Sequence, residues 1–110
     1  MTEKKIKVLV VDDQQELAAE IADILRTDRQ LDVLGTAVDG ADALGKMSDS
    51  VPDVVLLDIR MPNMNGLVAT SRIKAEHPDT KVLILTTFDD SDYILNAINN
   101  GACGYLLKDI

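Results

Sequence analysis

The chain has a single cysteine, Cys103, among its 110 residues. One thiol can form neither a disulfide bridge nor a thiolate metal site within the chain. Cys103 lies in the small-residue stretch GACG, where we expect it to pack against the core as a minor hydrophobic side chain. The sequence therefore excludes a disulfide framework and a cysteine-ligated metal centre built from this chain alone.

Basic residues are in the minority, with 11 Lys and Arg against 19 Asp and Glu and a formal net charge of -8. They are scattered, so the chain has no basic patch for nucleic-acid phosphates or an anionic membrane. The apolar run near the N-terminus is far too short for a signal peptide or a membrane span. We predict a cytoplasmic protein that binds neither nucleic acid nor membrane directly.

The chain also lacks repeats, low-complexity segments and linkers, and its length suits one compact domain. Apolar residues make up 46% of it, enough for one core. Apolar, β-branched runs predict strands, and apolar residues at helical spacing predict the helices between them. The expected strands are 6–11, 31–38, 53–57, 81–86 and 105–107, with helices at 14–27, 40–47, 67–76 and 91–100. Because the strand runs are apolar on both faces, the alternation predicts a parallel sheet covered by helices on both sides.

Polar side chains stand where the expected strands end. Asp12 and Asp13 follow the first strand, Asp58 the third, Thr86 ends the fourth and Lys108 follows the fifth. Parallel strands end at one edge of the sheet, and sites in open α/β sheets lie there, at the switch point in strand order. If the first and third strands are neighbours, the three carboxylates converge, with the hydroxyl and the ammonium group close by.

Three carboxylates in one place repel one another, and a hard divalent cation relieves that repulsion. Mg²⁺ prefers oxygen ligands and leaves room for a phosphate oxygen, so one acid could attack a phosphoryl group. Each residue also has an ordinary explanation: Asp13 as a helix cap, Lys108 as a surface lysine, Thr86 as a β-branched strand residue. Their joint placement at one edge favours the functional interpretation.

The motifs VLVVDD, VVLLDIRMPNMNG, LILTT and GYLLKD resemble, in this order, those of CheY-like response regulator receiver domains. The resemblance covers essentially the whole chain. The stretch LTTFDDSDYILNAINNGACGYLLKD is especially similar to receivers of the NarL/LuxR-type subfamily of two-component transcriptional regulators. The resemblance implies a doubly wound α/β fold, (βα)₅ in type, with a five-stranded parallel sheet in the order 2-1-3-4-5.

The resemblance also implies a function. Asp58 would accept a phosphoryl group from a histidine kinase, with Mg²⁺ held by the side chains of Asp13 and Asp58, by Asp12 through water, and by the backbone carbonyl of Arg60. Such a domain is a phosphoacceptor with slow self-dephosphorylation rather than a turnover enzyme. The first and fifth helices of this subfamily commonly form a homodimer face, and a C-terminal helix-turn-helix domain binds DNA.

Five residues also acquire roles from the resemblance. Thr86 and Lys108 would contact the phosphate, and Tyr105 would be the aromatic side chain that moves with Thr86 on switching. Pro62 and Gly66 would shape the loop after Asp58.

The sequence stops at Ile110, before the fifth helix that the family has, so we interpret residues 1–110 as a receiver domain truncated after the fifth strand. This predicts apolar surface open to solvent on the side of that strand, and leaves dimerisation through that helix in question.

Two alternatives remain open at this point. One is a pseudo-receiver that is not phosphorylated and acts as a protein-interaction module. The other is a dehalogenase-type phosphatase, which needs a second acid two residues after its nucleophile, where this chain has Arg60. A flavodoxin-like cofactor site is disfavoured because no phosphate-binding glycine loop follows the first strand.

Overall fold

The computed structural model describes residues 4–58, 66–86 and 91–107. Within these ranges strands and helices alternate, and every element begins and ends within one residue of the range expected from the sequence. The elements are β1 (Ile6–Val11), α1 (Gln15–Arg26), β2 (Leu31–Ala37), α2 (Gly40–Met47), β3 (Val54–Asp58), α3 (Gly66–Glu76), β4 (Lys81–Thr86), α4 (Ser91–Asn99) and β5 (Gly104–Leu107).

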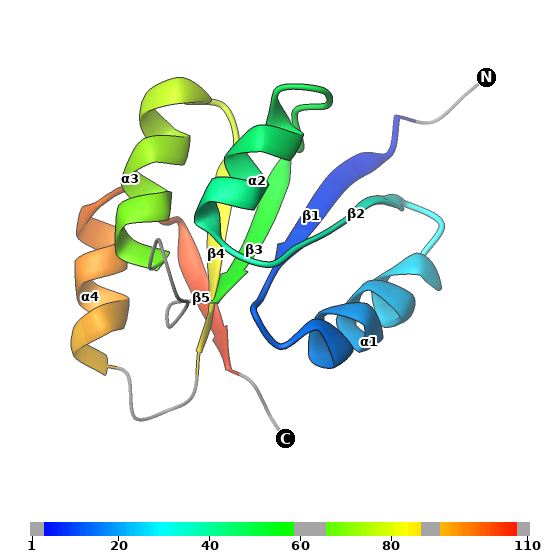
Figure 1. Ribbon diagram of the computed structural model, residues 1–110, viewed down its shortest axis with the longest axis horizontal. Helices are drawn as coiled ribbons and strands as arrows, with labels where there is room; N and C mark the ends of the chain where they lie inside the picture. The colour runs from blue at the N-terminus through cyan, green and yellow to red at the C-terminus, as the bar shows by residue number, and fades with distance from the viewer. Residues whose placement is uncertain (1–3, 59–65, 87–90, 108–110) are drawn as a thin grey trace.

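The strands form one parallel sheet in the order β2-β1-β3-β4-β5, which confirms the predicted fold class. Among the described helices, α1 lies on one side of the sheet and α2, α3 and α4 lie on the other (Figure 1). Alternate strand residues therefore enter two separate cores. The buried residues of the larger core are Leu9, Val11, Ala37, Ala43, Met47, Val55, Leu57, Ala69, Ile73, Val82, Ile84, Ala97 and Ala102. Those of the smaller core are Val8, Val10, Ala18, Leu56 and Leu85.

Gly35 interrupts the apolar pattern of β2 but does not end the strand. The register shifts there, because Val8 lies opposite Val33 whereas Leu9 lies opposite Gly35. Gly35 has a φ of 146°, a region that side-chain-bearing residues rarely adopt. The glycine thus allows an irregularity in the ladder, after which pairing continues to the end of β1.

The start of α2 shows how local sequence fixes a helix boundary. The Asp39 side chain accepts a hydrogen bond from the backbone N–H of Asp42 at 2.8 Å, and Asp42 Oδ2 accepts one from the N–H of Val38 at 2.9 Å. The first bond satisfies an N–H group that the start of a helix leaves without a partner in the helix, and the second ties the residue before the N-cap to the first turn. The helix therefore begins directly after Asp39.

Apolar surface is exposed on β5, as expected. Tyr105 and Leu106, on opposite faces of this edge strand, are 49% and 47% exposed. The expectation for Cys103 was wrong, because its side chain is exposed. The neighbouring Ala102 takes the buried position, and Cys103 instead attaches its backbone N–H to the carbonyl of Val82 at 2.9 Å. None of the helices in the described ranges is long and apolar enough to span a membrane.

Candidate functional site

The acidic residues of β1 and β3 meet at the carboxyl ends of these strands. In the β1–β3 ladder Val11 lies opposite Leu57, so Asp12 and Asp58 follow side by side. One carboxylate oxygen from each of Asp12, Asp13 and Asp58 lies within 4.8 Å of the others. Asp12 and Asp58 are 0% and 7% exposed, whereas Asp13 is exposed. The sheet therefore brings together the three acids that the sequence singled out.

The spacing of these oxygens fits Mg²⁺ with small adjustments. Mg²⁺ holds oxygen ligands at about 2.0–2.1 Å in an octahedron, so two of its ligands lie about 3 Å apart when adjacent and about 4 Å apart when opposite. Separations of no more than 4.8 Å reach that range with shifts of under about 1 Å. All three donors are hard carboxylate oxygens, which is the ligand type that this ion prefers.

The loop between β1 and α1 is fixed by its own hydrogen bonds. Asp12 Oδ1 accepts from the backbone N–H of Gln14 at 2.9 Å, and the N–H of Asp12 donates to the carbonyl of Ala37 at 3.0 Å. The N-cap of α1 is Gln14, whose side chain makes no capping bond. Asp13 is thus not the N-cap of α1, and the ordinary explanation considered for it in the sequence does not apply.

Thr86 and Tyr105 lie on the neighbouring strands β4 and β5. Asp58 pairs with Leu85, so Thr86, which is 1% exposed, stands one residue beyond the acid at the same edge. Tyr105 pairs with Ile84, so the two side chains lie on the same face of the sheet. Thr86 is two residues after Ile84 in β4 and therefore lies on that face as well. Tyr105 has solvent on one side and is not locked in the core.

Gly66 is the first residue of α3 and is buried, with its carbonyl accepting a hydrogen bond from the Thr70 hydroxyl at 2.7 Å. Arg60, Pro62 and Lys108, which the sequence also assigned to the site, lie outside the described residues.

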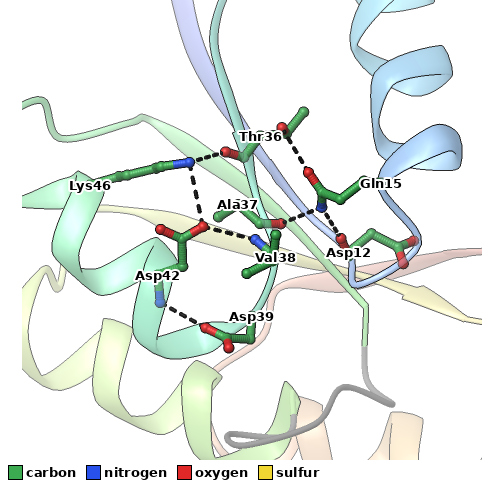
Figure 2. A network of polar contacts seen from close by, with 8 residues as sticks. All are labelled: Asp12, Gln15, Thr36, Ala37, Val38, Asp39, Asp42 and Lys46. Atoms are coloured by element: carbon green, nitrogen blue, oxygen red, sulfur yellow. Dashed lines mark hydrogen bonds and ion pairs between the residues drawn. The ribbon is translucent and has the colours of Figure 1, made fainter.

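The structure adds a group of polar residues that the sequence analysis did not identify. Gln15, at the start of α1, is hydrogen-bonded to Asp12 and to the end of β2, and Lys46 of α2 holds the same end of β2 from the other side (Figure 2). The only signal in the sequence is an amide side chain close behind an acidic pair, which by itself indicates nothing more than a polar helix start.

Comparison with known proteins gives the family. The model of the response regulator receiver domain matches residues 8–110. The chain therefore belongs to the response regulator receiver domain family, as the fold and the acidic cluster indicate. It is a receiver of the kind found in two-component transcriptional regulators, and it resembles those of the NarL/LuxR type.

Individual relatives support that assignment. The transcriptional regulatory protein LnrK of Bacillus subtilis is 46% identical over 105 residues, which cover 96% of this chain and 48% of LnrK. The signal receiver domain of the putative response regulator NarL of Mycobacterium tuberculosis is 34% identical, with a TM-score of 0.90 over 98% of this chain and 87% of that one. A DNA-binding response regulator of the LuxR family from Staphylococcus aureus is 30% identical, with a TM-score of 0.84 over 93% of this chain and 85% of that one. The chain spans about half the length of LnrK.

Proposed function

We propose that this receiver domain accepts a phosphoryl group on Asp58 from a phosphorylated histidine of a partner kinase, in a Mg²⁺-dependent reaction. A carboxylate oxygen of Asp58 attacks phosphorus, the P–N bond to the donor histidine breaks, and its electron pair leaves with the imidazole. The observation that carries the proposal is the convergence of the three carboxylates at one sheet edge in a chain of this family.

The residues around Asp58 have two roles in this proposal, binding Mg²⁺ and shaping the loop after β3. Asp13 and Asp58 would hold Mg²⁺ through their side chains, Asp12 would act mainly through water, and Arg60 would offer its backbone carbonyl. When bound, Mg²⁺ supplies positive charge against the transferring oxygens. Pro62 and Gly66 shape the loop that carries Arg60, since a proline fixes its own φ and a glycine lets the backbone turn.

Lys108 and Thr86 contact phosphate oxygens in the phosphorylated state. Phosphorylation replaces about one negative charge at Asp58 with about two, which draws the Thr86 hydroxyl inward. Tyr105, which shares the sheet face of Thr86, then fills the space it leaves. The surface around α4 repacks in response and changes its affinity for partners. The domain is a phosphoacceptor with slow self-dephosphorylation, not a turnover enzyme.

The relatives support a proposal about the partners of this protein. LnrK is a transcriptional regulator about twice as long as this chain, and the Staphylococcus aureus relative is a DNA-binding regulator. We therefore expect the full-length protein to carry a C-terminal helix-turn-helix domain that this receiver controls, and to work in the cytoplasm. A second copy of the protein, in a homodimer, is the third partner included in the proposal. With a net charge of -8, the receiver itself is not expected to contact nucleic acid or membrane.

The test is intact-mass spectrometry after incubation with Mg²⁺ and acetyl phosphate. We expect one added phosphoryl group on the wild type and none on Asp58→Asn. Asp79→Asn, which changes an exposed acid in the loop before β4 in the same way, is the matched control and should be modified like the wild type. A folded wild type that gains no phosphoryl group would contradict the proposal, and failure to bind Mg²⁺ as well would favour the interaction-module alternative.

A further inference from the structure

Asp13 differs from the other two acids in how it is held. Asp12 and Asp58 are buried within the sheet edge, whereas Asp13 is exposed and projects from the loop after β1. The peptide that joins Asp12 to Asp13 is planar, so the direction of the Asp12 carbonyl fixes the plane from which Asp13 projects. That carbonyl accepts a hydrogen bond from Gln15 Nε2 at 2.5 Å. Gln15 thus fixes the backbone that carries the exposed acid.

The same side chain ties the loop to the end of β2. Gln15 Nε2 also donates to the carbonyl of Ala37 at 3.3 Å, and Gln15 Oε1 accepts from the Thr36 hydroxyl at 3.4 Å (Figure 2). The carbonyl of Ala37 accepts the Asp12 N–H as well. One amide therefore connects the acidic loop to two successive residues of a strand.

The end of β2 is itself anchored from the other side. Lys46 Nζ donates to the carbonyl of Thr36 at 2.5 Å and lies 3.4 Å from Asp42 Oδ2. Asp42 in turn accepts the N–H of Val38. Residues of α2 hold the carboxyl end of β2 in place. The hydrogen bonds from Gln15 therefore attach the acidic loop to a strand end that is itself held (Figure 2).

We infer that Gln15 is a positioning residue for the Mg²⁺ site: its amide holds the Asp12–Asp13 peptide in the orientation that presents Asp13 to the ion. The inference rests on the proposed function and adds to it a residue that does not itself contact the ion. Without the amide, the peptide rotates more freely, and binding must fix it at a cost in affinity. Groups that orient metal ligands in this way typically contribute about 10-fold or more to metal affinity.

The chain offers a matched pair of variants. Gln15→Met keeps the length of the side chain and removes its polar atoms, whereas Gln14→Met makes the same change one residue earlier. The Gln14 side chain makes no capping bond, and its backbone N–H, which binds Asp12, is retained in the variant. Titration calorimetry measures Mg²⁺ affinity directly, and the rate of phosphorylation by acetyl phosphate is followed as a function of Mg²⁺ concentration.

We expect Gln15→Met to raise the Kd for Mg²⁺ by about 10-fold and Gln14→Met to change it by less than about twofold. The Mg²⁺ concentration for half-maximal phosphorylation should rise by the same factor in Gln15→Met. Its maximal rate at saturating Mg²⁺ should stay close to that of the wild type, because the occupied site holds Asp13 in place.

Three results would overturn the inference. The first is a Gln15→Met protein that binds Mg²⁺ as the wild type does, even if its melting temperature falls, since that is a purely structural role. The second is an equal loss of affinity in Gln14→Met. In both cases a wild type that is still phosphorylated leaves the proposed function intact. The third is a wild type that binds no Mg²⁺, which would contradict the proposed function as well.

Discussion

The two ends of the sheet are built differently. At the amino ends of the strands, backbone groups of adjacent segments bond to one another: Asp53 N–H to the carbonyl of Lys7 at 2.8 Å and Lys81 N–H to the carbonyl of Asp53 at 2.9 Å. The buried hydroxyl of Thr80 donates to the carbonyl of Pro52 at 2.8 Å. These bonds are made within the chain and need no ligand.

The carboxyl ends of β1 and β3 also have a backbone bond between segments, from the Asp12 N–H to the Ala37 carbonyl, but they bring together Asp12, Asp13 and Asp58, with one carboxylate oxygen of each within 4.8 Å of the others. Like charges at this distance repel, so the arrangement costs stability until a cation joins it. The comparison indicates that the contacts at the amino ends stabilise the fold. The acidic cluster at the carboxyl ends lowers the stability of the metal-free protein and provides ligands for a cation. Substitutions at the two ends should therefore differ in sign and in their response to Mg²⁺.

The largest expected effect is the stabilisation of the wild type by Mg²⁺. At a Mg²⁺ concentration of 100 times Kd, binding to the folded state alone raises the free energy of unfolding by about 2.7 kcal/mol. Asp13→Asn should lose most of this increment at the same concentration, because it removes a proposed ligand. Denaturant unfolding in Mg²⁺ and in EDTA measures this increment in the free energy of unfolding for the wild type and for Asp13→Asn. An undiminished increment in Asp13→Asn would mean that Mg²⁺ binds elsewhere.

The next effect belongs to the amino end. Thr80→Val removes the hydroxyl and leaves the buried carbonyl of Pro52 without its hydrogen bond, which should lower the free energy of unfolding by about 2 kcal/mol. The Mg²⁺ increment should be unchanged. Thr27→Val is the matched control, since the Thr27 hydroxyl also donates to a backbone carbonyl, that of Ile24. This position is exposed, so water can take the place of the lost hydroxyl. An equal loss in both variants, or a smaller Mg²⁺ increment in Thr80→Val, would contradict the separation of the two ends.

The sequence predicted the fold well because its signals are local and agree with one another. Strands β1, β3 and β4 contain apolar runs, α1 and α2 have apolar residues at helical spacing, and Gly35 marks a real irregularity in β2. The meeting of Asp12, Asp13 and Asp58 followed from topology alone, since parallel strands end at one edge.

What sequence reasoning missed depends on side-chain reach and on which side of the chain a residue faces. Gln15 contacts Ala37 across 22 positions, and only the placement of β2 beside β1 brings them together. Cys103 was predicted to be buried from its small neighbours, but its exposure is decided by the path of the chain into an edge strand. Composition does not determine either of these features.

The smallest effect is the most direct test of the comparison, because its sign is unusual. In EDTA, Asp13→Asn removes one of three mutually repelling charges, and we expect the free energy of unfolding to rise by about 0.5 kcal/mol. Asp39→Asn is the matched control at the same end of the sheet. Asp39 caps α2, and asparagine caps helices about as well as aspartate, so this variant should change stability little. The gain in Asp13→Asn should shrink as salt is added, since salt screens an exposed charge. A loss of stability in metal-free Asp13→Asn would mean that Asp13 stabilises the fold, and that the two ends of the sheet differ less than their hydrogen bonds indicate.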